Sequence, residues 1–207
     1  MATSPKSAPS GDRTDDPVRE RIVTAARAHF FQHGYRGVTM DDLAAEMAMS
    51  KKTLYVHFQS KRSLLEATID QKFGDLECEM ASVGSGISED FGETLHRLLV
   101  CMRLHAQEVS PTFLRDLAKD DPQLIAQVKA RRRELIGRTF GRILRAGQKS
   151  GSIRKDIGVD LLVEILMGIA DSVASPENLA EKRMGPGEVL PAILAVFLEG
   201  IQVTKGR

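Results

Sequence analysis

Two short capped helices separated by a tight turn are predicted within residues 38–65, and they constrain the fold more than any other stretch of the chain. Thr39 is a favourable N-cap, and Asp41 and Asp42 place negative charge at the positive end of the helix dipole that follows. Ser50 can cap a second helix soon afterwards. A helix, a turn of about three or four residues and a second helix form a helix-turn-helix, whose second helix lies in the major groove of DNA.

Apolar residues recur at helical spacing in both predicted helices, so each helix has one face for a core. These residues are Met40, Leu43, Ala44 and Met47 in the first helix, and Leu54 and Phe58 in the second. Leu54 and Phe58 lie opposite Lys51 and Tyr55, and the latter pair is therefore predicted to be exposed.

Positive charge is concentrated on and just after the second helix. The chain as a whole is nearly neutral, with 29 Lys and Arg against 28 Asp and Glu. Residues 50–62 nevertheless contain no acidic side chain. Their basic side chains are Lys51, Lys52, His57, Lys61 and Arg62. This local excess favours an anionic partner such as DNA, and the simpler alternative is a solvated helix face.

The stretch Ser50–Phe58, which reads SKKTLYVHF, resembles the recognition-helix segment of TetR-family transcriptional regulators, and Ser60 and Lys61 match the start of the family's next helix. The upstream positions that fit are Ile22, Ala25, Ala26, Phe30, Gly34, Tyr35, Thr39, Leu43 and Ala44. The resemblance covers roughly residues 19–65. Two positions depart from the family pattern: Ala48 replaces a Gly common in the turn, and Lys52 replaces a small residue. A left-handed Ala48 would be strained, whereas Lys52 adds a long cation that faces the DNA.

The resemblance and the side-chain chemistry together predict the DNA contacts. The first turn of a recognition helix meets base edges, and Lys can donate to guanine O6 and N7. The predicted base contacts are Lys51, Lys52 and Thr53. Hydroxyl, imidazole and ammonium groups at helix ends bind phosphates without reading the sequence. The predicted phosphate contacts are Thr39, Tyr55, His57 and Lys61.

A further helix is predicted over residues 17–33, and it completes a three-helix N-terminal domain. Asp15 or Asp16 can cap this helix, and Gly34 suits a left-handed residue at its end. Residues 1–14 contain Ser, Pro, Gly and Lys but little apolar surface, so we expect a disordered tail.

The rest of the chain is predicted to be helical. Helices are expected over 61–82, 91–107, 111–118, 122–149, 159–174 and 187–203, with turns at 84–86, 120–122, 147–151 and 175–187. We therefore expect an all-α protein of about nine helices. Its expected parts are the tail (1–14), the helix-turn-helix DNA-binding domain (15–60) and a larger helical domain for effector binding and dimerisation (61–207).

The chain has no segment typical of a signal peptide and no run of about eighteen apolar residues, so a cytoplasmic location is expected. Cys78 and Cys101 are far apart and lack the spacing of metal ligands. We expect no metal site and no cofactor, and a redox-sensing cysteine pair is the alternative for these two thiols.

The last two predicted helices are the most apolar and are predicted to form a dimer interface. Its candidate residues are Leu162, Leu166, Ile169, Leu190, Leu194, Phe197 and Ile201. In TetR-like proteins the corresponding helices pair with those of a second subunit, which implies a homodimer and a palindromic operator. The alternative is that these faces form the core of a single chain.

TetR-like regulators have an effector pocket among their middle helices, and the resemblance implies one here. Met and Phe form adaptable apolar walls, and a polar group within an apolar helix needs a partner. The candidates are Met102, His105, Phe113, Phe140, Met167 and Asp171. Each of them could instead be ordinary core or surface.

A basic stripe runs from Arg131 to Lys149 along one predicted helix. Its members at helical spacing are Arg138, Arg142, Arg145 and Lys149. Three interpretations stay open: a solvated face, pairing with an acidic stripe on the next helix, or binding of an anionic effector such as an acyl-CoA or a carboxylate. The acidic stripe consists of Asp160, Glu164 and Asp171.

The sequence therefore predicts a sequence-specific DNA-binding transcriptional regulator. We expect a homodimeric repressor that an unidentified small-molecule effector releases from its double-stranded operator, with the helix over 61–82 linking the two domains. The first alternative is an architectural DNA-binding protein without an effector. The second is an enzyme, which the absence of a Gly-rich phosphate loop, Gly-x-Ser-x-Gly and His-Glu-x-x-His disfavours.

Overall fold

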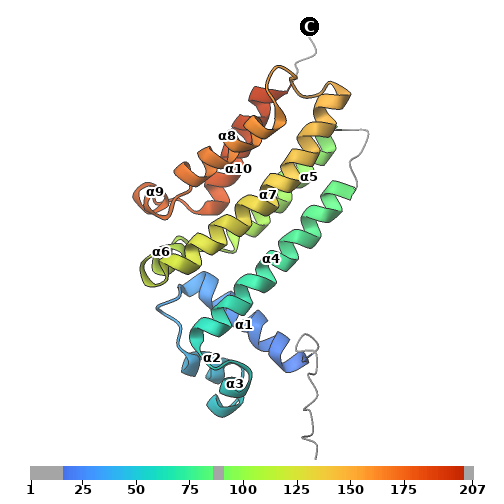
Figure 1. The fold of residues 1–207 in the computed structure, drawn as a ribbon. Helices are drawn as coiled ribbons and strands as arrows, with labels where there is room; N and C mark the ends of the chain where they lie inside the picture. The colour runs from blue at the N-terminus through green and yellow to red at the C-terminus, as the bar shows by residue number, and fades with distance from the viewer. Residues whose placement is uncertain (1–15, 86–90, 203–207) are drawn as a thin grey trace, which may run out of the picture.

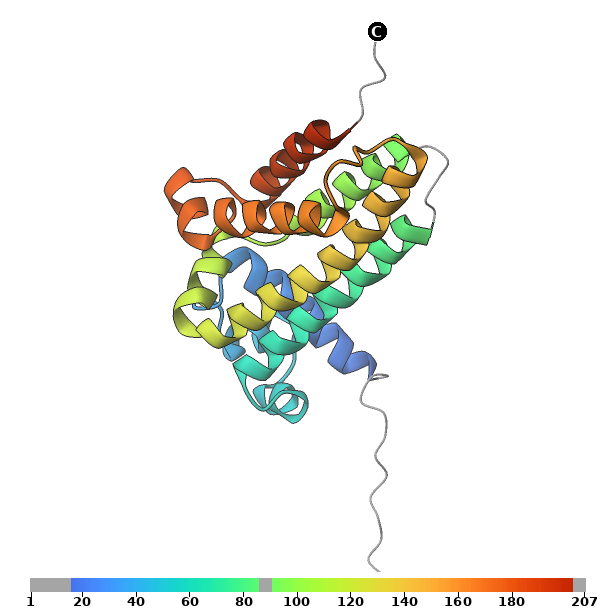
Figure 2. The same ribbon diagram turned by 45° about the horizontal axis from the view of Figure 1, so that its top comes forward.

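The computed structural model describes residues 16–85 and 91–202, and the ten helices found there form an elongated all-α molecule (Figures 1 and 2). The N-terminal domain consists of α1 (Pro17–His33), α2 (Met40–Glu46) and α3 (Lys51–His57). The C-terminal domain consists of α4 (Lys61–Ser85), α5 (Phe91–Gln107), α6 (Pro111–Asp120), α7 (Pro122–Ser150), α8 (Val159–Val173), α9 (Pro176–Lys182) and α10 (Pro186–Ile201). The all-α prediction is confirmed, and the predicted tail at 1–14 lies outside the described residues.

Capping side chains fix the helix starts of the N-terminal domain. Asp16 accepts hydrogen bonds from first-turn amides of α1, the nearer at 3.0 Å. Thr39 and Asp42 form a capping box at the start of α2. The Ser50 hydroxyl accepts from the Thr53 N–H at 3.0 Å at the start of α3. These side chains satisfy amides that the first turn of a helix leaves without a partner, so the predicted helix starts are confirmed.

The sequence analysis assigned α9 to a turn, and this assignment was wrong. Ser175 caps α9 by accepting from the Asn178 N–H at 3.2 Å, Pro176 occupies its first turn, and Arg183 ends it in the left-handed region. The helix is short and rich in polar residues, so its sequence lacks a clear apolar periodicity. The other predicted helices are all present, with ends that differ by a few residues.

One continuous cluster of buried apolar side chains extends from the N-terminal domain into the C-terminal domain. In this arrangement α1 packs against α4, α4 packs against α5 and α7, and α10 packs against α5. The largest fully buried side chains are Ile22, Phe30, Leu43, Leu54, Leu64, Leu65, Met80, Leu98, Leu117, Phe140, Ile143 and Leu144. Because interiors are closely packed, a displacement of α4 must alter contacts in both domains.

A second connection joins the N-terminal domain to α6, a helix that the sequence analysis did not place there. The Arg36 guanidinium Nε lies 3.0 and 2.9 Å from the two carboxylate oxygens of Asp120. The rings of Phe31 and Phe113 have centroids 4.9 Å apart, and the Ser110 N–H donates to the Phe31 carbonyl at 2.9 Å. The N-terminal domain is therefore held by α6 as well as by α4.

Within residues 16–85 and 91–202, no helix taken singly has both the length and the apolar character to cross a bilayer. Judged by length and composition only, α9 and α10 together could span a bilayer, and they are bent by 102° at the break between them.

Candidate DNA interface and ligand cavity

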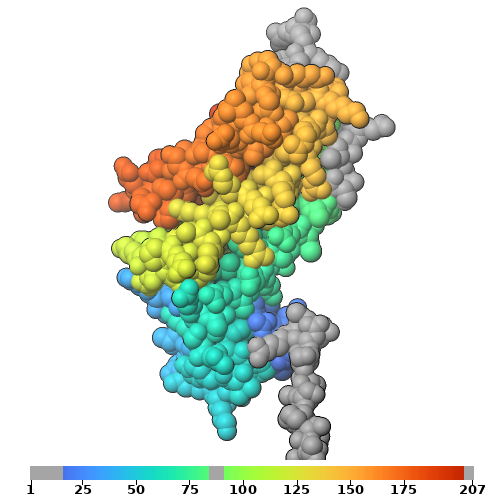
Figure 3. Space-filling model, in the orientation of Figure 1, coloured from blue at the N-terminus to red at the C-terminus, as the bar shows by residue number. Residues whose placement is uncertain are grey.

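Helix α3 lies at one end of the elongated molecule (Figures 1 and 3). The three predicted base-contact residues, Lys51, Lys52 and Thr53, are all exposed in its first turn. Leu54 and Phe58 are buried, as predicted from their position on the opposite side of the helix. The helix therefore turns a polar and basic first turn toward solvent.

Two of the predicted base contacts already have neighbours within the N-terminal domain. The Lys51 ammonium pairs with Asp41 of α2, and both side chains are more than half exposed. The Thr53 hydroxyl oxygen lies 2.8 Å from that of Ser50. An exposed ion pair contributes little to stability, so a phosphate or a base edge can compete for Lys51.

The predicted phosphate contacts Thr39 and Tyr55 differ in their surroundings. The Thr39 hydroxyl donates to the Asp42 carboxylate at 2.7 Å, and this bond lowers the pKa of Asp42. Thr39 is therefore engaged in the capping box. Tyr55 is 45% exposed on the same helix as the base-contact candidates.

The other two phosphate candidates, His57 and Lys61, both pack within the N-terminal region. His57 Nδ1 lies 3.0 Å from the carboxylate of Asp16, the N-cap of α1. The Lys61 ammonium lies 4.2 Å from the centre of the Tyr35 ring, and burial lowers the pKa of Lys61. Contacts of either residue with DNA stay predictions.

The turn between α2 and α3 contains a strained residue. Ala48 has φ of 51°, in the left-handed region that favours glycine. The Met49 N–H donates to the Ala44 carbonyl at 3.0 Å and closes the turn around it. Ala48 therefore has the left-handed geometry considered from the sequence, and this conformation is strained for a residue with a Cβ.

The sequence analysis missed Val56, which is 74% exposed on α3. An apolar side chain on a recognition helix can contact the methyl group of thymine. The available signal was an apolar residue on the polar face of the helix. Val56 therefore joins the candidate base contacts.

A cavity of about 150 Å³ lies where α1, α4, α5, α6, α7 and α10 meet. Its walls are mostly apolar and include Phe31 of α1, Phe73 of α4 and Phe113 of α6. Among the described residues, its ionisable lining groups are Lys72, His105 and Arg132, and no Asp or Glu lines it. The cavity is thus an apolar space with a basic edge.

Three of the six predicted pocket residues line this cavity, and the other three do not. Met102, His105 and Phe113 are in its walls. Met167 lines a smaller neighbouring cavity that also includes Met102. Phe140 is fully buried in the core. Asp171 instead pairs with arginines of α7, as described below.

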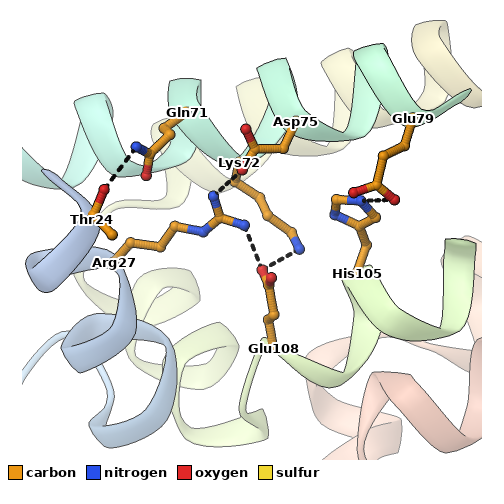
Figure 4. A network of polar contacts seen from close by, with 8 residues as sticks. All are labelled: Thr24, Arg27, Gln71, Lys72, Asp75, Glu79, His105 and Glu108. Atoms are coloured by element: carbon orange, nitrogen blue, oxygen red, sulfur yellow. Dashed lines mark hydrogen bonds and ion pairs between the residues drawn. The ribbon is translucent and has the colours of Figure 1, made fainter. Parts of the chain in front are cut away.

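A network of charged side chains connects the N-terminal domain to the edge of the cavity (Figure 4). Arg27 of α1 pairs with Asp75 of α4, and its second terminal nitrogen lies 2.7 Å from Glu108, just after α5. Glu108 also accepts from the ammonium of Lys72, which lines the cavity. One carboxylate therefore contacts a residue of the DNA-binding domain and a residue of the cavity wall.

The ionisation of this network follows from burial and pairing. Burial lowers the pKa of Lys72, and the hydrogen bond with Glu108 opposes this only in part. Burial acts to raise the pKa of Glu108, but hydrogen bonds from Arg27 and Lys72 outweigh it and hold that pKa below its ordinary value. Glu108 is therefore charged at neutral pH.

Beside this network, ligand atoms of Glu79, Cys101 and His105 lie within 4.8 Å of one another. The Cys101 thiol donates to Glu79 Oε2 at 3.6 Å, and His105 Nε2 lies 3.1 Å from the same oxygen. Burial and the nearby Glu79 raise the pKa of Cys101 to about 11, so the thiol keeps its proton at neutral pH. Hydrogen bonds that converge on Glu79 account for this cluster. In the sequence, the proximity of Cys101 and His105 is visible from their spacing of one helical turn.

Most of the residues predicted for a dimer interface are buried within the single chain. Leu162, Leu166, Leu194, Phe197 and Ile201 are buried, Leu190 is half-buried, and Ile169 is 39% exposed. The large apolar side chains exposed on α8 and α10 are Leu161, Ile165, Ile169 and Val196, and of these only Ile169 was among the predicted residues. Helical spacing identified the apolar residues correctly but did not show which of them face the core and which face solvent.

The basic stripe of α7 pairs in part with the acidic stripe of α8. Asp171 forms ion pairs with Arg132 and Arg133, and Arg145 Nη1 lies 3.8 Å from Asp160. Of the three interpretations of the stripe, internal pairing is therefore the one with direct contacts. Arg132 links this contact to the cavity that it lines.

The fold and these sites define a helix-turn-helix DNA-binding protein with a cavity between its larger helical domain and α1 of the N-terminal domain. Residues 22–68 match the family model of the bacterial regulatory proteins of the tetR family. The chain belongs to the TetR family of helix-turn-helix transcriptional regulators, which is a family of regulators and not of enzymes.

Relatives match over most of the chain. The HTH-type transcriptional regulator YvaF of Bacillus subtilis is 27% identical over 182 residues, which cover 88% of this chain and 94% of that protein. The HTH-type transcriptional repressor DhaR of a Mycobacterium species is 26% identical over 162 residues, which cover 73% and 77%.

Solved structures share the fold. A transcriptional regulator from Cytophaga hutchinsonii has a TM-score of 0.68 at 21% identity and covers 91% of this chain and 100% of that one. A regulator from Saccharomonospora viridis in complex with choline has a TM-score of 0.65 at 24% identity and covers 90% and 98%.

Proposed function

We propose that this TetR-family regulator is a homodimeric repressor that binds a palindromic operator and is released from it by a small molecule in the cavity. The observation that supports this most is the position of Phe31, which belongs to α1 of the N-terminal domain and also lines the cavity. A ligand that changes the cavity walls therefore acts directly on a helix of the DNA-binding domain. The ratio of the ligand's affinities for the two domain arrangements sets how far the ligand lowers the affinity for DNA.

Two similar proteins support two parts of this proposal. DhaR is a repressor, which favours repression as the outcome here. The Saccharomonospora viridis regulator was solved with choline, which favours a small-molecule ligand for this fold.

The homodimer is proposed to form through the outer faces of α8 and α10. Leu161, Ile165 and Ile169 follow one another at a spacing of one helical turn on α8, and Val196 is 73% exposed on α10. Exposed apolar residues in a row favour a protein partner. A two-fold dimer would bring together two recognition helices, which matches two half-sites of a palindrome.

In each subunit, Lys51, Lys52, Thr53 and Val56 are proposed to contact base edges, and Thr39, Tyr55, His57 and Lys61 to contact phosphates. The first group comes from the exposed face of α3. The second group lies on α3 and at the starts of α2 and α4. Thr39, His57 and Lys61 have partners within the chain that DNA would have to displace.

The test is a selection of duplexes from a random pool by the purified full-length protein, followed by fluorescence anisotropy at matched salt. We expect a palindromic consensus bound about a thousandfold or more tightly than scrambled DNA. Lys52→Ala should reduce that preference, because it removes a base contact. Lys155→Gln, an exposed lysine in the turn after α7, is the control and should leave it unchanged.

The competing function is that of an architectural DNA-binding protein. Such a protein would enrich no consensus and would bind scrambled DNA equally well, with an affinity that depends only on salt. That result would overturn the operator-binding proposal. The cavity beside α1 favours the regulated function, since an architectural protein has no use for it.

A further inference from the structure

We propose that the cavity binds a compact apolar carboxylate through Lys72 and His105, and that Glu108 transmits this binding to Arg27 of the N-terminal domain. This inference rests on the proposed function, because it takes the cavity as the effector site. It adds the chemical class of the ligand and the contact that couples it to DNA binding.

The charge of the cavity edge selects an anion. The apolar walls suit a hydrocarbon body, and the ionisable groups among the described lining residues are the basic Lys72, His105 and Arg132. Arg132 is already paired with Asp171 of α8. The carboxylates that pair with these groups, Glu79, Glu108 and Asp171, do not line the cavity, so a ligand meets the basic groups first. A ligand carboxylate would therefore gain charge-assisted hydrogen bonds.

His105 has an unused hydrogen-bonding position. The residue is 9% exposed, and its Nδ1 is buried without a hydrogen-bond partner among the described residues. Its Nε2 is held 3.1 Å from Glu79, which fixes the orientation of the ring. A buried polar atom without a partner is costly, and the polar head group of a ligand in the cavity would supply that partner.

Lys72 is the second anchor and the start of the coupling. Its side chain is only 11% exposed, and it donates to Glu108. Figure 4 shows Lys72 from α4 and His105 from α5 reaching into the space between these helices. A ligand carboxylate that approaches Lys72 therefore competes with Glu108 for the same ammonium and repels it as a like charge.

Glu108 connects this competition to the N-terminal domain. Its carboxylate lies 2.7 Å from a terminal nitrogen of Arg27, whose side chain is 13% exposed on α1. When Glu108 loses Lys72 and moves away from the ligand, the contact between α1 and the end of α5 must rearrange. The positions of α1 and of the recognition helix packed near it then change together.

The size of the cavity limits the ligand. At about 150 Å³ it is as large as an engineered cavity that holds benzene, so it has room for one ring or a short chain. The smaller cavity beside it shares four lining residues with it and continues toward Met167. A somewhat longer chain would extend in that direction.

Calorimetry on the full-length protein tests the ligand class without DNA. The probes are hexanoate with hexanamide and hexan-1-ol, and phenylacetate with phenylacetamide. We expect at least one carboxylate to bind more tightly than about 1 mM and about tenfold or more tightly than its neutral partners. Equal or tighter binding of the amide or the alcohol, or no binding of either carboxylate, would overturn the proposal.

Lys72→Gln tests the anchor, and Lys155→Gln is its control because it removes the same charge from an exposed site. We expect Lys72→Gln to weaken carboxylate binding about tenfold to a hundredfold and to leave amide binding unchanged. A merely structural role of Lys72 would weaken both ligands alike and would overturn the assignment. If Lys72→Gln does not fold, the comparison of carboxylate and amide on the wild-type protein still decides the ligand class.

Glu108→Gln tests the coupling with the duplex selected above. In the wild-type protein, the tighter carboxylate probe should weaken DNA binding about five-fold to 150-fold. Glu108→Gln should bind the probe at least as tightly, yet lose most of this release. Full release in the variant would overturn the role of Glu108. If the probe binds the wild-type protein without affecting DNA affinity, the ligand-release function fails while the carboxylate site stands.

Discussion

The backbone N–H of Arg36 donates a hydrogen bond to the buried carboxylate of Asp116 at 3.1 Å, and this contact joins the DNA-binding domain to α6. Gly34 makes the approach possible, because a Cβ at that position would lie 2.7 Å from Asp116 Oδ2. The Arg36 side chain reaches Asp120 on the same helix. The connection depends on a glycine that also ends α1.

Gly34→Ala should destabilise the protein by about 2 kcal/mol or more, because Gly34 has φ of 84° and no space for a Cβ. Urea denaturation followed by circular dichroism measures this loss. Gly74→Ala is the matched control: a Cβ at Gly74 meets nothing within 4 Å inside α4, so it should be neutral or stabilising. Equal stability of the two variants would contradict the close packing at α6.

Ala48→Gly should stabilise the protein by about 1 kcal/mol, since it removes a side chain from a left-handed residue. The expected rise in Tm is about 2–4 °C. Ala45→Gly, three residues earlier and exposed within α2, should act in the opposite direction because glycine disfavours a helix interior. A fall in Tm for Ala48→Gly would show that the turn does not bear this strain in solution.

Ile165→Glu should convert the proposed dimer to a monomer, because it places a charge in the exposed apolar row of α8. Light scattering after size-exclusion chromatography measures the mass, and anisotropy should show weaker operator binding. Ile165 is 39% exposed, so the monomer should keep its helical circular dichroism. Ile165→Leu, which keeps an apolar side chain at this position, is the control and should remain a dimer. A dimeric Ile165→Glu protein would place the interface elsewhere.

Glu108 should make the stability of the protein sensitive to acid. Its pKa lies below the ordinary value of 4.5 in the folded state, so its contribution is present above that pH and is lost as the pH falls through the folded pKa. The side chain is partly exposed, so we expect less than about 1 kcal/mol. Urea denaturation of Glu108→Gln should therefore show lower stability than wild type at pH 7 and converge with it in acid. Glu199→Gln, an exposed glutamate of α10, should follow wild type throughout.

The N-terminal domain could be predicted closely because its boundaries are set by local chemistry. Thr39, Ser50 and Asp16 cap their helices through contacts with residues two or three positions away, and such spacing is visible in a sequence. The resemblance to the TetR family added the placement of α3 against DNA. Val56 was missed because the base contacts were predicted only from the first turn of α3, and Val56 lies one turn later.

The C-terminal domain was less predictable because its sites depend on which helices meet. Helical spacing showed that α8 and α10 have apolar faces, but most of the residues chosen for a dimer lie in the chain's own core. Met102, His105 and Phe113 were found as cavity residues by their chemistry. Phe31 and Lys72 were not, since nothing local indicates that α1 and α4 contribute to the same wall.

Phe31 has a consequence for how such a regulator can evolve. The side chain belongs at once to the cavity wall and to the helix that supports the DNA-binding domain. Under the proposed function, a substitution at this position that reshapes the cavity for a new ligand also changes the affinity of the ligand-free protein for DNA. If the proposed function holds, ligand choice and basal expression are inherited together, and a change of ligand would require compensating changes elsewhere in the chain.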